Sequence, residues 1–130
     1  MNPSEIPKLH IPEIIFREDG IVCVDHGYAR TLTSEGVLEV LRIRREFSLK
    51  PMPLMIKMDG RPILDPKIIS IVKSAEYCEV TPAVAYVTSS WYVRQLLDTY
   101  MTIQTPSYPL FVFEQEEEAL AWLSRFVPAK

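Results

Sequence analysis

The sequence is poor in cysteine and glycine, and it has no excess of basic residues. Its two cysteines, Cys23 and Cys78, form no CxxC pair, and two cysteines in 130 residues do not make a disulfide scaffold. Four glycines are too few for a phosphate-binding P-loop or a dinucleotide fingerprint. The net charge of -3 argues against a general nucleic-acid binder, which needs a basic face.

Long hydrophobic runs are also missing. Charges such as Lys57 and Asp59 interrupt every apolar segment, so none reaches the length of a membrane span. Residues 1–12 contain three prolines and no apolar run, which is unlike a signal peptide. We therefore expect a soluble cytoplasmic protein with two reduced, buried thiols and no insertion into membranes.

The composition is that of a folded protein, with 48% hydrophobic and 24% charged residues. A length of 130 residues suits one domain. Because of the prolines, residues 1–12 are predicted to form a flexible arm, and residues 13–130 a single domain.

The hydrophobic pattern predicts alternating strands and helices. Strands are expected at 13–17 and 21–25, joined by a hairpin turn at Asp19-Gly20, and then at 54–58, 83–87 and 110–113. Helices are expected after the N-caps Thr33 and Asp65, after an N-cap supplied by Thr88, Ser89 or Ser90, and from Glu116. This ββαβαβαβα order predicts a single α/β domain with a five-stranded mixed, mostly parallel sheet and helices packed on it.

The apolar faces of two of these helices can be read from the spacing. In the first helix the expected inner face holds Gly36, Val40, Ile43 and Phe47, with Val37 and Leu41 beside them. Arg42, Arg44 and Arg45 form the densest basic cluster. That cluster is either a solvated helix face, with Arg42 and Glu46 paired, or a docking patch for an acidic partner. The second helix, after Asp65, is expected to present Ile68, Ile69, Ile71, Val72 and Ala75.

Candidate binding residues follow the predicted strands. In an open parallel sheet, ligands bind beyond the carboxyl ends of the strands, where free N–H groups at helix starts and nearby arginines can hold an anion. The candidate residues at these ends are His26, Arg30, Asp59, Gly60, Arg61, Thr88, Ser89, Ser90 and Trp91. The alternative is that the polar members of this set only cap helices and turns.

No catalytic constellation is visible. His26 could act as a general base with Asp25 or Asp59, but Asp25 and His26 are neighbours and would point to opposite faces of a strand. Ser89 and Ser90 lack the glycines of a nucleophile elbow. The dispersed histidines and cysteines do not supply a metal site. We expect no catalytic residues, no metal and no cofactor, and a small hydrolase using His26 and Asp59 is the least favoured option.

Three segments carry a family resemblance. They are Ala-Val-Ala-Tyr-Val at 83–87, Pro-Leu-Phe-Val-Phe at 109–113, and Glu-Ala-Leu-Ala-Trp-Leu at 118–123. Together with the element order, they resemble the STAS domain, the SpoIIAA-like fold of anti-sigma-factor antagonists, in a branch of uncharacterised bacterial proteins. The resemblance implies a non-enzymatic regulatory or scaffolding module that acts through protein–protein interaction. Its implied partners are another copy of itself, as a homodimer or higher oligomer, and another regulatory protein.

The sequence departs from that family at one position. Anti-sigma-factor antagonists carry a phosphorylated Ser or Thr after the strand that 54–58 would match. Here residues 58–65 contain Asp59 and Asp65 but no hydroxyl residue. We therefore expect a module without the usual phosphorylatable residue.

A second hypothesis belongs to another class: a small apolar or anionic ligand, such as a lipid-like metabolite, bound in a pocket at the strand carboxyl ends. A contiguous internal cavity would favour ligand binding. A filled core with an exposed apolar patch would favour protein docking.

Overall fold

A computed structural model describes residues 12–48 and 50–128, apart from the side chains of Ala29 and Arg30. The predicted arm at 1–12 lies outside these residues except for Pro12. In chain order the elements are β1 (Glu13–Phe16), β2 (Val22–Leu32), α1 (Ser34–Phe47), β3 (Leu54–Leu64), α2 (Lys67–Val72), α3 (Ala75–Glu79), β4 (Val84–Val87), α4 (Trp91–Ile103), β5 (Leu110–Phe113), α5 (Glu116–Leu123) and a 3₁₀ turn (Ser124–Phe126).

The five strands form one sheet in the order β1-β2-β3-β4-β5. β1 pairs antiparallel with β2, and the other neighbours are parallel. Gly20 adopts a φ of 88° in the hairpin turn, a conformation that glycine reaches without steric cost. The predicted mixed, mostly parallel α/β sheet is confirmed.

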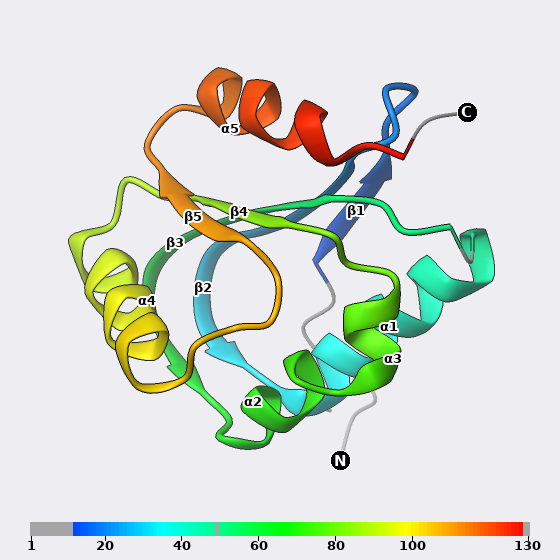
Figure 1. Cartoon of the computed structure of the whole chain (residues 1–130). Coiled ribbons are helices and arrows are strands. Elements are labelled where there is room, and N and C mark those ends of the chain that lie inside the picture. Colours follow the sequence, from blue (N-terminus) through cyan, green and yellow to red (C-terminus); the bar gives the residue numbers. More distant parts are fainter. Residues whose placement is uncertain (1–11, 49, 129–130) are drawn as a thin grey trace, which may run out of the picture.

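The helices divide between the two faces of the sheet, as Figure 1 shows: α5 covers one face, and α1 to α4 lie on the other side. Under α5 the core is closely packed around Met55, Ala85, Ala119 and Leu123, which have no exposed surface. The opposite face carries two clusters, one around Val24 and Leu54 and one around Leu32 and Met58. This second face is the one on which the main cavity lies.

Strands β2 and β3 are longer than predicted. The expected ends were residues 25 and 58, but the strands continue to Leu32 and Leu64. The pairing of β3 with β4 ends at Lys57, but β2 and β3 continue to pair with each other in parallel, from Tyr28↔Asp59 to Leu32↔Leu64. The β2–β3 pairing contains two register shifts. Residues expected in loops, including His26, Asp59 and Arg61, therefore lie within strands. Gly27 and Gly60 adopt φ values of 62° and 94° along this stretch.

The buried face of α1 agrees with the predicted one at Gly36 and Val40 but differs at the end of the helix. Val40, Leu41 and Arg44 are buried, whereas Phe47 is exposed and stacks on Phe16 with ring centroids 3.9 Å apart. Positions 37, 40, 41 and 44 form one helical stripe. The assignment of Arg44 to a solvated cluster is thus wrong, while Arg42 does donate a 2.6 Å hydrogen bond to Glu46 on the exposed face.

The predicted second helix is two short helices. The break falls at Lys73 and Ser74, where the Ser74 hydroxyl accepts a hydrogen bond from Tyr77 N at 3.2 Å and starts α3. The N-cap of α2 is Pro66, with no side-chain capping bond, and not the predicted Asp65, which precedes it and accepts from Lys67 N at 3.0 Å. Of the predicted buried thiols, Cys23 is buried but Cys78 is only half-buried. Its sulfur lies near the surface, 3.2 Å from Ser107 Oγ.

Candidate functional site

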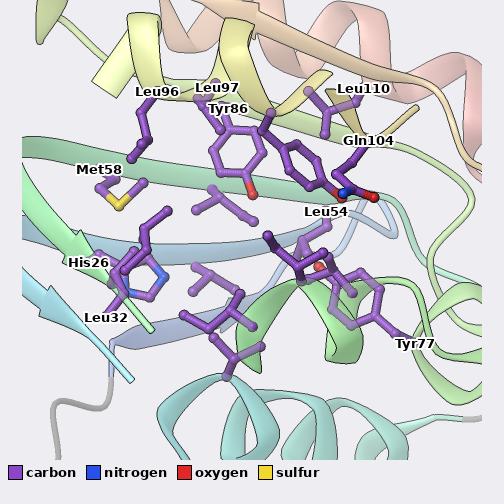
Figure 2. A pocket seen from close by; sticks show the side chains of 18 of the residues that line it. His26, Leu32, Leu54, Met58, Tyr77, Tyr86, Leu96, Leu97, Gln104 and Leu110 are labelled. Carbon is purple, nitrogen blue, oxygen red and sulfur yellow. The ribbon is translucent and has the colours of Figure 1, made fainter. Parts of the chain in front are cut away.

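A cavity of about 310 Å³ lies between one face of the sheet and the helices above it. Figure 2 shows its side chains converging from β2, β3, β4, α4 and the segment after α4. Known small-molecule pockets have volumes of roughly 300–1,000 Å³ and are lined mainly by apolar and aromatic side chains. The cavity is at the lower end of that range, and most of its lining is hydrocarbon.

The sheet supplies the floor of the cavity through strand alternation. Val24 and His26 of β2 point to the same face, as do Leu54, Ile56 and Met58 of β3. Tyr86 of β4 extends its ring over this floor, with its hydroxyl toward the middle of the space (Figure 2). Burial raises the pKa of Tyr86 above its ordinary value, because the phenolate would lose its hydration.

Helix α2 covers the cavity without burying its own side chains. Its sequence, Lys-Ile-Ile-Ser-Ile-Val, is mostly apolar, yet none of its residues is buried. Ile68, Ile69 and Val72 line the cavity, and across from them α4 contributes residues that include Leu96 and Ile103. Ile103 is 70% exposed, so part of this apolar wall faces solvent. The space between α2 and α4 is thus the mouth of the cavity.

One end of the cavity is polar. Arg44 of α1 is only 4% exposed and lines the cavity with Tyr77, Tyr100 and Tyr108. Its Nη2 donates to Val80 O at 3.0 Å and to Thr81 Oγ1 at 2.9 Å. Its guanidinium carbon lies 5.4 Å from the centre of the Tyr77 ring. Burial lowers the pKa of Arg44, and the two tyrosines Tyr77 and Tyr108 oppose that shift.

Two polar atoms at this end have no hydrogen-bond partner among the residues that the structure describes. They are Arg44 Nη1 and the Tyr100 hydroxyl oxygen, both buried. Buried polar groups in native proteins are nearly always paired, and each exception calls for an explanation such as a missing water or ligand. The pKa of Tyr100 is raised by its burial.

His26 lies apart from the acids proposed to orient it. It lines the cavity, whereas Asp25 points the other way, with Oδ2 3.9 Å from Lys57 Nζ and Oδ1 accepting from Gly27 N at 2.8 Å. The prediction that these neighbours face opposite sides of the strand agrees with this geometry. Asp59 lines a different pocket. His26 and Asp25 therefore face opposite sides of β2, and Asp59 lines a pocket that does not include His26.

A second pocket, a groove of about 290 Å³, lies at the start of α4. Six of the predicted binding residues line it together with two tyrosines: Asp59, Gly60, Arg61, Ser89, Ser90 and Trp91, with Tyr28 and Tyr92. Tyr28 is 79% exposed and Trp91 is 74% exposed. Six residues predicted from the strand ends therefore lie together, and the two tyrosines were not among the predicted residues.

The carboxylate of Asp59 holds residues 88–90, just before α4, in place by hydrogen bonds. Its Oδ1 accepts hydrogen bonds from Ser89 N at 2.8 Å, Ser90 N at 3.2 Å, and the hydroxyls of Thr88 and Ser89 at 3.0 Å each. Burial alone would raise the pKa of Asp59, but these donors hold it below its ordinary value. Ser90 caps α4 by accepting from Val93 N and donates to Gly60 O at 2.7 Å. The alternative of polar residues that cap turns and helices describes Asp59, Thr88 and Ser90 well.

The other predicted residues fall elsewhere. Thr88 is buried; its hydroxyl donates to Asp59 and accepts from Ser90 N at 3.0 Å. The side chain of Arg30 lies outside the described residues. What sequence reasoning missed is Arg44, and a signal was present: it continues the stripe of Val37, Val40 and Leu41 by one more turn.

In residues 12–48 and 50–128 the structure shows no cluster of three metal-ligating side chains. Over the same part of the chain no helix is long and apolar enough to cross a membrane.

Comparison with known proteins agrees with this fold. A crystal structure of an uncharacterised DUF3478-family protein from Shewanella loihica PV-4 is similar, with a TM-score of 0.59 and 15% sequence identity over 90% of this chain and 97% of that one. That protein has a SpoIIAA-like fold, and the chain described here is of the same class. Residues 15–127 match the family described as Domain of unknown function (DUF7793), and the chain belongs to that family. No curated protein matches the sequence.

Proposed function

We propose that this protein binds a small apolar ligand in the cavity between the sheet, α1, α2 and α4. The observation that carries the proposal is the contiguous cavity of about 310 Å³ with its largely apolar lining. Of the two hypotheses drawn from the sequence, it supports ligand binding over a purely surface-acting module. The cavity does not have the position predicted for a ligand pocket, because it lies over a face of the sheet and not beyond the strand carboxyl ends.

The cavity is too large to be an ordinary packing defect. Protein interiors pack like organic crystals, and voids larger than a water molecule are few. The cavity is partly open, so some of its apolar lining faces water. A ligand that fills the space would remove that lining from water, which is favourable by roughly 25 cal/mol per Å² of apolar surface.

Helix α2 supports the same conclusion. Ile68 and Ile69 line the cavity without becoming buried, so they gain little from folding in the empty protein. An occupant would remove them from water. A short helix with few buried contacts is also the kind of element that opens locally at low free-energy cost, which gives the ligand a way in.

The test uses a neutral fluorescent probe, N-phenyl-1-naphthylamine, and a pair of matched variants. Val37 is half-buried and lines the cavity, while Leu38, its neighbour on α1, is exposed and lies outside it. We expect the wild-type protein to enhance the fluorescence of the probe, Val37→Phe to weaken binding by about tenfold or more, and Leu38→Phe to bind like wild type. Absence of binding to the wild type, or equal binding by both variants, would overturn the proposal.

Because Val37→Phe could disturb the packing of α1, a second variant fills the cavity from the opposite wall. Leu96 is half-buried on α4, and Leu96→Phe is expected to weaken probe binding in the same direction. Circular dichroism spectra of all three variants should match that of the wild type.

A second candidate function is self-association at the groove, as expected of a regulatory or scaffolding module. The exposed side chains of Tyr28 and Trp91 favour it, because interfaces are enriched in tyrosine, tryptophan and arginine, and Arg61 lines the same groove. In sedimentation velocity, a dimeric wild type that becomes monomeric on Trp91→Ser would support it. A monomeric wild type at high concentration would count against it.

A further inference from the structure

We propose that the ligand is a single-chain carboxylate of the fatty-acid type, with its carboxylate bound by Arg44 and its hydrocarbon chain in the apolar part of the cavity. This inference rests on the proposed function and adds the chemical class of the ligand. The observation behind it is a buried guanidinium, half of whose terminal donors are unused, at one end of a cavity lined mainly by hydrocarbon.

One terminal nitrogen of Arg44, Nη2, is held by protein atoms, and the other, Nη1, is available to a ligand. Nη2 is held by Val80 O and Thr81 Oγ1, so the plane of the guanidinium is set before any ligand binds. Nη1 is buried and has no partner among the described residues. Arginine is well suited to binding carboxylates, since its planar fork donates two parallel hydrogen bonds and keeps its charge when buried.

The charge of Arg44 is also without a counter-ion. The ion pairs of the described residues do not include it, although Arg42 and Arg45 on the same helix both have carboxylate partners. Removing a charge from water costs several kcal/mol unless an opposite charge compensates. The face of Tyr77 offers partial compensation. A ligand carboxylate would supply the rest.

Nearby hydroxyls match a carboxylate head. The Tyr100 hydroxyl is buried without a partner among the described residues and can donate a hydrogen bond. Tyr100 lines the same cavity as Arg44 and Tyr77. Its hydroxyl is thus a second donor available to the head of a ligand in this cavity.

The far end of the cavity disfavours a negative head. Asp65 lines the cavity there and accepts hydrogen bonds from Ser34 N at 3.4 Å and Lys67 N at 3.0 Å. Ser34 and Arg44 are ten residues apart on α1, which corresponds to about 15 Å at 1.5 Å per residue. Asp65 N donates to Leu32 O at 3.1 Å, and Leu32 and Met58 lie away from Tyr77 (Figure 2). The charges thus orient the ligand, with its head at Arg44 and its tail toward Leu32.

The experiment compares decanoate with 1-decanol by isothermal titration calorimetry on the full chain. The two ligands share their chain length and differ at the head group. A purely apolar cavity would prefer the alcohol, which loses less hydration on burial. We expect wild type to bind decanoate at least about tenfold more tightly than 1-decanol, and Arg44→Met to reverse that preference. Arg45→Met is the matched control, because Arg45 bonds Glu76 O outside the cavity, and it should behave like wild type.

The outcomes separate this inference from the proposed function. If neither ligand binds the wild type, both proposals fail. If 1-decanol binds as tightly as decanoate, the cavity takes apolar ligands but the carboxylate assignment is wrong. If decanoate is preferred by wild type and Arg44→Met alike, Arg44 is not its partner.

Since Arg44 is buried, Arg44→Met could fail to fold, and a second measurement needs only the wild-type protein. In ¹⁵N-labelled protein the guanidinium resonances of Arg44 should shift on addition of decanoate and stay unchanged with 1-decanol. Unchanged resonances at a saturating concentration of decanoate would overturn the assignment.

Discussion

Lys73 Nζ donates a 2.8 Å hydrogen bond to Gln104 Oε1, and this contact joins the end of α2 to the end of α4 beside the mouth of the cavity. Gln104 itself lines the cavity, and Lys73 follows directly on Val72, which also lines it. The side chains of Ile69 and Ile103 on either side are apolar and partly exposed. The Lys73–Gln104 contact therefore connects the two helices between which a ligand would enter.

Removing this contact should speed exchange of a ligand without unfolding the protein. An exposed hydrogen bond to a charged side chain contributes little to global stability, about 1 kcal/mol or less. For Lys73→Ala we expect a faster off-rate for N-phenyl-1-naphthylamine in stopped-flow fluorescence and a melting temperature close to that of wild type. Lys50→Ala, on an exposed loop before β3, is the control. An unchanged off-rate would show that α2 and α4 do not form the entrance.

Asp59 should matter for stability more than for binding in the cavity. Asp59→Ala removes the acceptor of four hydrogen bonds and should lower the free energy of unfolding by about 2 kcal/mol, the range for bonds to a charged group. Asp59→Asn keeps one acceptor oxygen and should lose less. Urea unfolding of the three proteins near neutral pH measures both effects. Equal stability of wild type and Asp59→Ala would contradict the structural role.

The contribution of Asp59 should also depend on pH, with a definite sign. Its pKa is lowered below the ordinary value of 3.8, so the folded state favours the ionised form. That stabilisation is complete above 3.8 and is lost as the pH falls through the lower pKa of the folded state. The stability difference between wild type and Asp59→Asn should therefore shrink in acid. A difference that grows as the pH falls would refute this assignment.

The buried tyrosines set the alkaline limit. Burial raises the pKa values of Tyr77, Tyr86 and Tyr108 above 10.0, so in the folded protein these groups keep their protons longer than in the unfolded chain. Folding is therefore stabilised less as the pH rises above 10.0. We expect the free energy of unfolding to decline there and Tyr86→Phe to make that decline shallower. The same slope in wild type and variant would remove Tyr86 from this explanation.

The two faces of the sheet should respond differently to truncation. Leu123 of α5 has no exposed surface, and Leu123→Ala should cost about 3 kcal/mol, as in other close-packed cores. Leu96 of α4 borders a space that already exists, so Leu96→Ala creates less new cavity and should cost clearly less in the ligand-free protein. Thermal unfolding compares them, and equal losses would indicate that the cavity is closed in solution.

The fold could be predicted largely from sequence because its signals are local. Asp19-Gly20 marks the hairpin, and the N-cap Thr33 accepts from Gly36 N as expected. Of the three candidate N-caps at 88–90, Ser90 is the one that accepts from Val93 N. Continuous apolar runs mark the central strands. What local signals do not contain is the mutual pairing of β2 and β3 beyond residues 25 and 58, since that pairing depends on two strands meeting far apart in the chain.

The sequence predicted only part of the candidate site, again because the rest depends on how distant segments of the chain pack together. Asp59, Arg61, Ser89 and Trp91 do meet in one groove, as the rule for strand ends predicts. The cavity could not be predicted, because empty volume depends on how far α2 and α4 stand from the sheet. Arg44 was assigned to solvent because charged residues are seldom buried without a partner. A buried arginine on an apolar stripe breaks that rule, and such exceptions mark functional sites.

The most direct test of the cavity as a ligand site is a methyl-resolved NMR titration of the full chain with decanoate. If the cavity is the binding site, methyl resonances of Ile56, Ile68 and Val24, which line it, should shift together and saturate. Those of Ile63, which is 70% exposed and outside the cavity, should stay in place. Shifts confined to Ile63 and other exposed methyl groups, or no saturable shifts, would contradict the assignment of this cavity as a ligand site.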